Sequence, residues 1–74
     1  MKTYMTSDLY LSAFLKAKGL KLITNETNGK KVTFVFEDRK DREQLVRSFF
    51  NNGSVNITDF KGALQDLKTI VFHI

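Results

Sequence analysis

Apolar and polar residues alternate along this chain with periods typical of both helices and strands. Over residues 9–18 the apolar side chains cover about two thirds of a helical circumference, which leaves Ser12 and Lys16 as a narrow polar stripe. Helix-capping side chains at 6–8 precede this stretch, and Gly19 follows it at a position where glycine adopts a positive φ most easily. The pattern predicts a helix through residue 18 that other elements cover on more than one side.

Two β-prone stretches follow, separated by the step Asn28-Gly29. Residues 20–25 and 30–37 are rich in apolar and β-branched side chains, and both residues of the step tolerate a positive φ. This combination favours an antiparallel hairpin closed by a type I′ turn. Alternation along the second stretch predicts a core face made of Val32, Phe34 and Phe36.

The second half of the chain predicts two further helices. Asp38 is placed to cap the first, which runs to about residue 51 and ends at the Asn-Asn-Gly sequence of 51–53. Asn56 is placed to cap the second, and Asp59 resembles the other half of a capping box. The apolar stripe of the second helix falls within about 140° of arc and consists of Ile57, Phe60, Ala63, Leu64, Leu67, Ile70, Val71 and Ile74.

The predicted elements follow the order β-α-β-β-α-α. The first strand of this order is a short, β-prone stretch at residues 3–5, which could form an edge strand of the sheet. The chain has no proline, repeat or linker, so these elements fill it as a single domain over residues 1–74. We expect an α+β fold, in which a small antiparallel hairpin sheet packs against helices to form a two-layer domain.

Three motifs of this chain resemble those of a known family. They are SDLYL at 7–11 with the Lys-Gly step at 18–19, VTFVFED at 32–38, and the closing pairs at 63–64 and 67–68. Together they resemble a family of small uncharacterised bacterial and phage proteins that share an S-D-L-Y-L opening, an F-x-F-E-D strand end and a closing L-K helix. The resemblance implies a common fold over nearly the whole chain. It implies no function, because the family has no established activity.

Charge is distributed unevenly over the 74 residues. The net charge is +4, and the whole excess lies in residues 1–31, because basic and acidic residues balance in 32–74. Such asymmetry is typical of a lysine-rich solubilising face and also of a protein with an anionic partner. On the second interpretation, the lysines of the first half are a candidate phosphate-contacting patch for weak nucleic-acid binding, if the fold brings them together. The candidates are Lys16, Lys18, Lys21, Lys30 and Lys31.

Reactive side chains are scarce in this sequence. It contains no cysteine and a single histidine, His73, so the familiar nucleophilic triads and Cys/His metal sites cannot be assembled. The carboxylates of residues 37–43 alternate with basic side chains, a pattern that favours local ion pairs over acid–base catalysis. We therefore expect a protein that is not an enzyme and that uses no metal or cofactor.

The sequence also bears on where the protein works. No stretch approaches the ~20 apolar residues of a membrane span, and the first residues lack the apolar segment of a signal peptide. We expect a cytoplasmic protein that does not contact a membrane.

An alternative interpretation is a protein-interaction module, most simply a homodimer. The first helix is apolar over most of its circumference, Ile23 and Val35 are predicted on the outer face of the hairpin, and Phe72 lies off the apolar stripe of the last helix. Exposed apolar side chains mark an interface when they are contiguous. A second copy would also enlarge the small core that 74 residues can bury.

Overall fold

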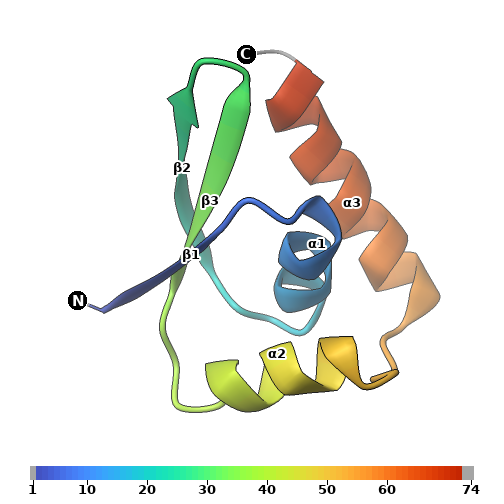
Figure 1. Cartoon of the computed structure of the whole chain (residues 1–74). Helices are drawn as coiled ribbons and strands as arrows, with labels where there is room; N and C mark the ends of the chain where they lie inside the picture. Colours follow the sequence, from blue (N-terminus) through green and yellow to red (C-terminus); the bar gives the residue numbers. More distant parts are fainter. Residues whose placement is uncertain (1, 73–74) are drawn as a thin grey trace.

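The chain forms one small antiparallel sheet with helices on one side of it (Figure 1). The computed structural model describes residues 2–72 and shows the predicted order β-α-β-β-α-α, which confirms the α+β fold. Sheet order is β1-β3-β2, so β3 is central and the N-terminal strand lies at an edge, as predicted. The elements are β1 (Thr3–Thr6), α1 (Leu9–Ala17), β2 (Leu22–Asn28), β3 (Lys31–Glu37), α2 (Arg42–Phe50) and α3 (Ile57–Phe72).

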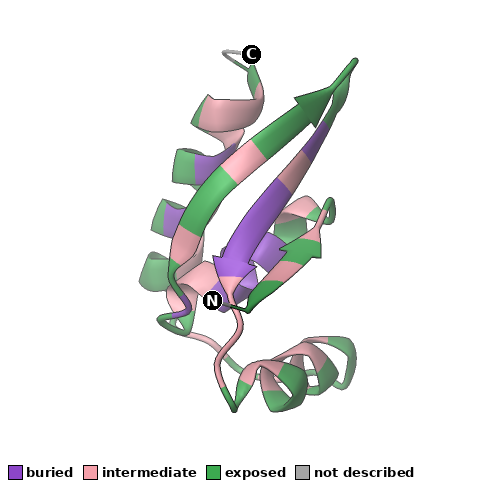
Figure 2. Ribbon diagram, turned by 90° about the vertical axis from the view of Figure 1, so that its left-hand side faces the viewer, coloured by how far each residue is buried: buried purple, intermediate pink, exposed green. Residues whose placement is uncertain are grey.

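The three helices leave one face of the sheet uncovered. Helices α1 and α3 cover its inner face, and α2 lies across one end, below α1 in Figure 1. Figure 2 looks onto the opposite face, over which no element within residues 2–72 lies. The core therefore fills the space between β3 and the helices. Its buried members are Leu11, Ala13, Leu15, Leu20, Val32, Phe34, Phe36, Ala63 and Leu67.

Local hydrogen bonds set both ends of α1. Asp8 Oδ1 accepts a hydrogen bond from the backbone N–H of Leu11 at 3.0 Å, which confirms the predicted N-cap. At the other end Gly19 has a φ of +94°, and the N–H of Leu20 donates to the carbonyl of Leu15 at 3.0 Å. This is the bonding pattern of a Schellman motif, which ends the helix and turns the chain towards β2.

The polar stripe predicted for α1 does not lie on the surface. Ser12 is fully buried, and its Oγ donates to the carbonyl of Asp8 at 2.8 Å. One turn later Lys16 Nζ lies 3.5 Å from Asp66 Oδ2, so this side of α1 is turned towards α3. Ser12, although part of the predicted polar stripe, is therefore a buried polar residue whose hydroxyl is satisfied within the helix. The prediction that α1 is covered on several sides is confirmed, because the sheet, α2 and α3 all pack against it.

The hairpin turn lies one position later than predicted. Asn28 pairs with Lys31, so the two-residue turn is 29–30 and not 28–29. Only Gly29 of these two residues has a positive φ, at +64°. A type I′ turn needs a positive φ at both central residues, whereas a type II′ turn needs it only at the first, so the turn fits type II′.

Helix α2 begins later than predicted because Asp38 has a different partner. The helix starts at Arg42, and Asp41 at the N-cap position makes no side-chain capping bond. Asp38 instead accepts a hydrogen bond from Arg42 Nε at 3.0 Å. The N–H of Asp38 donates to the carbonyl of Lys2 at 3.0 Å, which extends the pairing between β1 and β3. Asp38 therefore joins α2 to the sheet.

Helix α2 ends at the predicted stop, again in a Schellman arrangement. Asn52 has a φ of +62°, and the N–H of Gly53 donates to the carbonyl of Ser48 at 2.6 Å. A Cβ atom at position 53 would lie 2.6 Å from that carbonyl oxygen. Glycine is required here by the close approach of two backbone segments.

Helix α3 begins as predicted, but its first apolar residue is not buried. Asn56 Oδ1 accepts a hydrogen bond from the N–H of Asp59 at 3.0 Å, which confirms the cap. Ala63 and Leu67 are buried, whereas Ile57 is 81% exposed. Thr58 and Asp59 of the same turn line a shallow depression with Lys16 and Ala17 of α1, so Ile57 lies on the part of this turn that α1 does not cover. Ile74, the last predicted member of the stripe, lies outside the described residues, as does His73.

Candidate interaction surfaces

The five lysines of the predicted nucleic-acid patch do not gather on one surface. Lys16 pairs with Asp66, and Lys18 and Lys21 lie near it at the end of α1 and just before β2. Lys30 and Lys31 lie at the tip of the hairpin, beyond the far end of β2. Six residue steps along β2 separate the two groups by roughly 20 Å. Nucleic-acid binding therefore stays a prediction. The five lysines do not form the single patch on which that prediction was based.

The three predicted interface residues differ in exposure. Phe72 is 77% exposed at the last described turn of α3, and Ile23 is exposed as the extra residue of a β-bulge in β2. Val35 is only 6% exposed, so the prediction that it is open on the outer face is wrong. Its register partners, Met5 on β1 and Thr24 on β2, flank it on both sides. The two exposed residues, Phe72 and Ile23, lie on α3 and β2 and form no contiguous patch by themselves.

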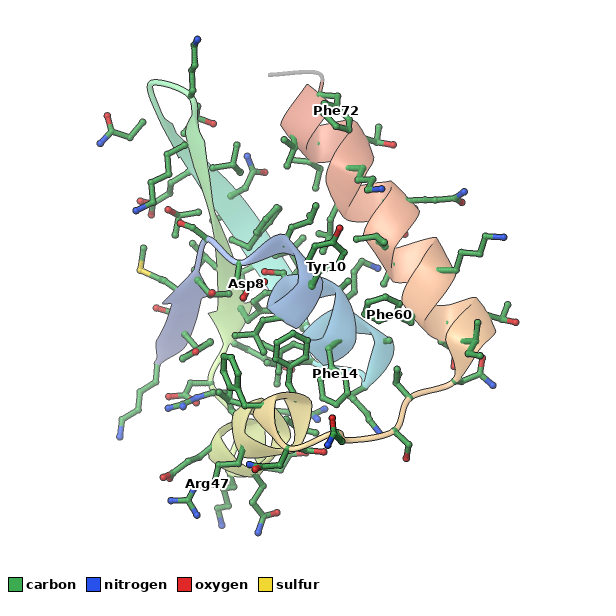
Figure 3. The ribbon with its side chains drawn as sticks, turned by 45° about the vertical axis from the view of Figure 1, so that its right-hand side comes forward. Asp8, Tyr10, Phe14, Arg47, Phe60 and Phe72 are labelled. Carbon is green, nitrogen blue, oxygen red and sulfur yellow. The ribbon has the colours of Figure 1, made fainter. Side chains whose placement is uncertain are left out.

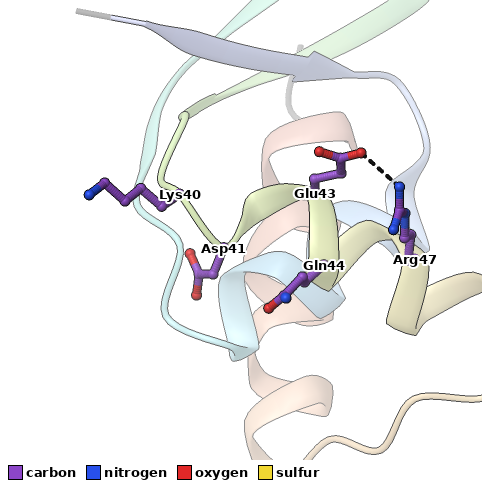
Figure 4. A pocket seen from close by; sticks show the side chains of 5 residues that line it. All are labelled: Lys40, Asp41, Glu43, Gln44 and Arg47. Carbon is purple, nitrogen blue, oxygen red and sulfur yellow. Dashed lines mark hydrogen bonds and ion pairs between the residues drawn. The ribbon is translucent and has the colours of Figure 1, made fainter.

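The carboxylates around the start of α2 are held in ion pairs, as predicted. Arg39 donates from Nε and Nη2 to the two carboxylate oxygens of Asp41 at 3.0 and 2.9 Å. Arg47 Nη2 lies 3.0 Å from Glu43 Oε1 (Figure 4). Between them lies an open polar depression of about 400 Å³, lined by Lys40, Asp41, Glu43, Gln44 and Arg47. Across residues 2–72 no three His, Asp or Glu side chains are grouped to hold a metal ion.

A half-buried cation joins α2 to the edge of the sheet. Arg42 Nε donates to Asp38 Oδ1 at 3.0 Å, and the guanidinium carbon lies 4.4 Å from the centre of the Tyr4 ring. The hydrogen bond to Asp38 raises the pKa of Arg42 above its ordinary value. Arg42 is therefore charged at neutral pH, and it joins α2 to β1 through Asp38 and the Tyr4 ring.

Replacing Arg42 with methionine is expected to lower the free energy of unfolding by about 1–2 kcal/mol, because it removes both the cation–π contact and the partly buried ion pair. Arg47→Met is the matched control, since its pair with Glu43 is well exposed. We expect the control to change stability by about 0.5 kcal/mol or less. Urea denaturation of both variants measures the difference, and equal losses would contradict the assignment.

Five aromatic residues from all three helices form a second surface, here called the aromatic face: Tyr10, Phe14, Phe49, Phe50 and Phe60. The ring centres of Phe14 and Phe49 are 5.5 Å apart and those of Phe49 and Phe50 are 5.1 Å apart, both edge to face. Figure 3 shows Tyr10, Phe14 and Phe60 on the same side of the molecule, along the junction of α1 with α3 and above α2. The aromatic face thus continues across three helices.

Exposure within the aromatic face is highest at the two rings that lie outside the core cluster and are not buried. Tyr10 is 56% exposed and Phe50 is 67% exposed, whereas Phe49 and Phe60 are half-buried. The core cluster packs without Tyr10, Phe14 and Phe50. Phe14 is buried, but beneath Phe49 and Lys18, whose Nζ lies 5.6 Å from its ring centre. Tyr10 and Phe50 are therefore the solvent-exposed rings of the aromatic face, and Phe14 is a buried ring beneath it.

The acidic residues of α3 lie on one side of the α1–α3 junction. On α1, buried Ala13 faces the junction, with Lys16 about 60° to one side of it and Tyr10 about 60° to the other. On the Lys16 side, α3 presents the acidic residues Asp59 and Asp66. On α3, Lys61 and Lys68 lie about 140–160° from Ala63, on the side that carries Phe72. These two lysines therefore do not border the aromatic face.

The sequence contained part of the signal for this surface, because the apolar circumference of α1 was one ground for the predicted interaction module. Tyr10 and Phe14 are four residues apart and share one side of α1, and Phe49 and Phe50 belong to the apolar stripe of α2. A helical stripe shows which residues share a side. It does not show whether another element covers that side, and no described element fully covers Tyr10 or Phe50.

Comparison with known proteins identifies the family. Among the described residues, no helix combines the length and apolar character needed to span a bilayer. No curated protein and no solved structure shows a significant match to this chain. The model of the family described as domain of unknown function DUF5659 matches residues 1–73, almost the full length of the chain. The protein therefore belongs to the DUF5659 family.

Proposed function

We propose that this domain is a non-enzymatic protein-interaction module and that the aromatic face is its contact surface. The observation that carries the proposal is the exposure of Tyr10 and Phe50, at 56% and 67%, beside half-buried rings on adjacent helices. Aromatic side chains are enriched at the centres of protein interfaces, where they account for much of the binding energy. A contiguous aromatic surface is therefore better explained by a partner than by chance exposure.

The distribution of the other aromatic residues supports this assignment. Phe34 and Phe36 lie on the core face of β3 and are buried, so they are not accessible for stacking on nucleotide bases. Phe72 and Ile57 are exposed singly near opposite ends of α3. Within residues 2–72, only the aromatic face combines several rings, more than one element and partial exposure. Scattered exposed residues need no functional explanation.

A nucleic-acid partner is less well supported by the same observations. The lysines from which nucleic-acid binding was predicted lie in two groups. One of these lysines, Lys16, is paired with Asp66. In the aromatic face, Lys18 stands over the Phe14 ring, and Phe49 packs edge to face with both of its neighbours. Base stacking needs open ring faces, which Phe14 does not offer.

Selection from a displayed library of random peptides tests the proposal. Wild-type protein is expected to enrich binding sequences, and the double variant Tyr10→Ser/Phe50→Ser is expected to bind them at least about tenfold more weakly, because it removes the exposed anchors. Phe72→Ser is the matched control, since Phe72 is equally exposed but lies off the aromatic face. Binding to the control should stay within about twofold of wild type.

Two outcomes would contradict the proposal. Failure of the wild-type protein to enrich any sequence removes its support, and so does equal loss of binding in the double variant and in Phe72→Ser. Thermal unfolding followed by circular dichroism checks that the double variant remains folded. We expect it to be folded, because Tyr10 and Phe50 lie outside the core cluster.

A further inference from the structure

We infer that Asn28, at the tip of the hairpin, is a site of spontaneous covalent modification by deamidation, and that the fold protects Asn52 from the same reaction. The chain contains two Asn-Gly steps, at 28–29 and at 52–53. Asparagine followed by glycine is the dipeptide in which this reaction is easiest, because glycine has no side chain to obstruct attack by its own backbone nitrogen. This reactivity is independent of the aromatic face and of its proposed partner.

The reaction needs only groups of the chain and water. The backbone nitrogen of Gly29 loses its proton and attacks the side-chain carbonyl carbon, Cγ, of Asn28. A nitrogen–carbon bond forms, ammonia leaves, and a five-membered succinimide ring results. Water then opens the ring at one of its two carbonyl carbons, which gives either aspartate or isoaspartate. In isoaspartate the main chain runs through the former side-chain carbon, and no atom is oxidised or reduced.

The hairpin turn leaves the reacting groups of Asn28 and Gly29 free. Both residues are exposed, and within residues 2–72 no hydrogen bond holds the Asn28 side chain or the N–H of Gly29. A Cβ atom at position 29 would meet no other atom within 4 Å, so the space around this residue is open. Asn28 and Lys31 also form the last pair of the β2–β3 ladder, and the ends of such elements open most easily.

The same dipeptide at the end of α2 is held by hydrogen bonding and packing. The N–H of Gly53 donates to the carbonyl of Ser48 at 2.6 Å, so removing its proton would leave an anionic nitrogen against a carbonyl oxygen. The backbone at Gly53 is also too close to Ser48 to rotate towards the Asn52 side chain without moving α2. Intramolecular reactions lose rate steeply when the reacting atoms are held apart. We therefore expect Asn52 to react slowly, although it is as exposed as Asn28.

The modification would change both the charge and the pairing of the hairpin tip. Asn28 is neutral, whereas either product carries a carboxylate close to Lys30 and Lys31. The same two ammonium groups favour the reaction, because positive charge stabilises the anionic nitrogen of Gly29. Isoaspartate also adds a carbon atom to the main chain, so it disrupts the pair between position 28 and Lys31.

Incubation of the folded protein at mildly alkaline pH tests the inference. Trypsin cleaves after Lys30 and after Lys61, so the two Asn-Gly steps are released in different peptides and mass spectrometry measures each reaction separately. Asn28 is expected to deamidate at least about tenfold faster than Asn52, because only its reacting groups are free to meet. Electron-transfer fragmentation should find isoaspartate as well as aspartate at position 28. Equal rates, or a faster reaction at Asn52, would overturn the inference.

Two controls show whether the fold is responsible for the difference. In guanidinium chloride the hydrogen bond of Gly53 is lost, and we expect Asn52 to react at a rate similar to that of Asn28. If Asn52 stays slow in the unfolded chain, the local sequence sets the rates and protection by the fold is wrong. Asn28→Gln should abolish the fast release of ammonia from the folded protein, because glutamine would have to form a six-membered ring. Persistence of the fast release would place the reaction at another residue and overturn the assignment.

Discussion

Phe36→Ala is expected to lower the free energy of unfolding by about 3–5 kcal/mol, because it leaves a cavity at the centre of the sheet. Phe36 is fully buried on the central strand, and its register partners are Tyr4 on β1 and Leu22 on β2. The cavity would lie between two strands and α1, where no single side chain can move to fill it. Urea denaturation followed by circular dichroism measures the loss.

The size of this effect is large for a chain of 74 residues. A domain of this length has roughly 4–11 kcal/mol of stability in total, so the variant is expected to be partly or fully unfolded near physiological temperature. Phe72→Ala, at a site 77% exposed, is the matched control and should change stability by about 0.5 kcal/mol or less. A loss below about 1 kcal/mol for Phe36→Ala would contradict the central position of its ring.

Gly53→Ala is expected to lower the free energy of unfolding by about 1–3 kcal/mol, through overpacking of backbone against backbone. The new methyl group would lie 2.6 Å from the carbonyl oxygen and 2.8 Å from the carbonyl carbon of Ser48, so the last turn of α2 has to shift. A rotation of the Ser48 side chain does not relieve this contact. Thermal unfolding of the variant, compared with wild type, measures the cost.

The neighbouring position provides the control for this prediction. Asn52 has a φ of +62°, a conformation that glycine adopts with less strain than asparagine. Asn52→Gly is therefore expected to be neutral or to raise stability by up to about 1 kcal/mol. If Gly53→Ala were as well tolerated as Asn52→Gly, the close approach of the two segments would not hold in solution.

Features of the fold that depend on neighbouring residues were predictable from the sequence. Asp8 and Asn56 cap helices through bonds to backbone N–H groups three residues away, and Gly19 ends a helix through its own φ. Each of these interactions needs only a few consecutive residues. The order of the elements follows from such local signals together with hydrophobic periodicity.

Features that depend on which elements meet in space were not predictable in the same way. Ser12 is buried because α3 packs against that side of α1, and Val35 is buried because strands lie on both sides of it. Ile57 has the period of the buried stripe but lies on the first turn of α3, where no described element covers its side chain. A one-dimensional pattern does not contain these arrangements.

The candidate surface was predicted only in part, from the apolar circumference of α1, for the same physical reason. The lysines were grouped by their closeness in the sequence, whereas β2 carries Lys30 and Lys31 to the far end of the sheet. The aromatic face arises from α1, α2 and α3, which are separated along the chain by the hairpin and by loops. Only the packing of the three helices brings its residues together.

The bulge at Ile23 also bears on how this small sheet avoids aggregation. Edge strands expose unpaired backbone groups that can pair with another chain, and both β1 and β2 are edges here. β1 has only four residues, and the register of β2 is interrupted between Leu22 and Thr24. Neither edge therefore offers the long, regular backbone ladder from which edge-to-edge polymerisation starts.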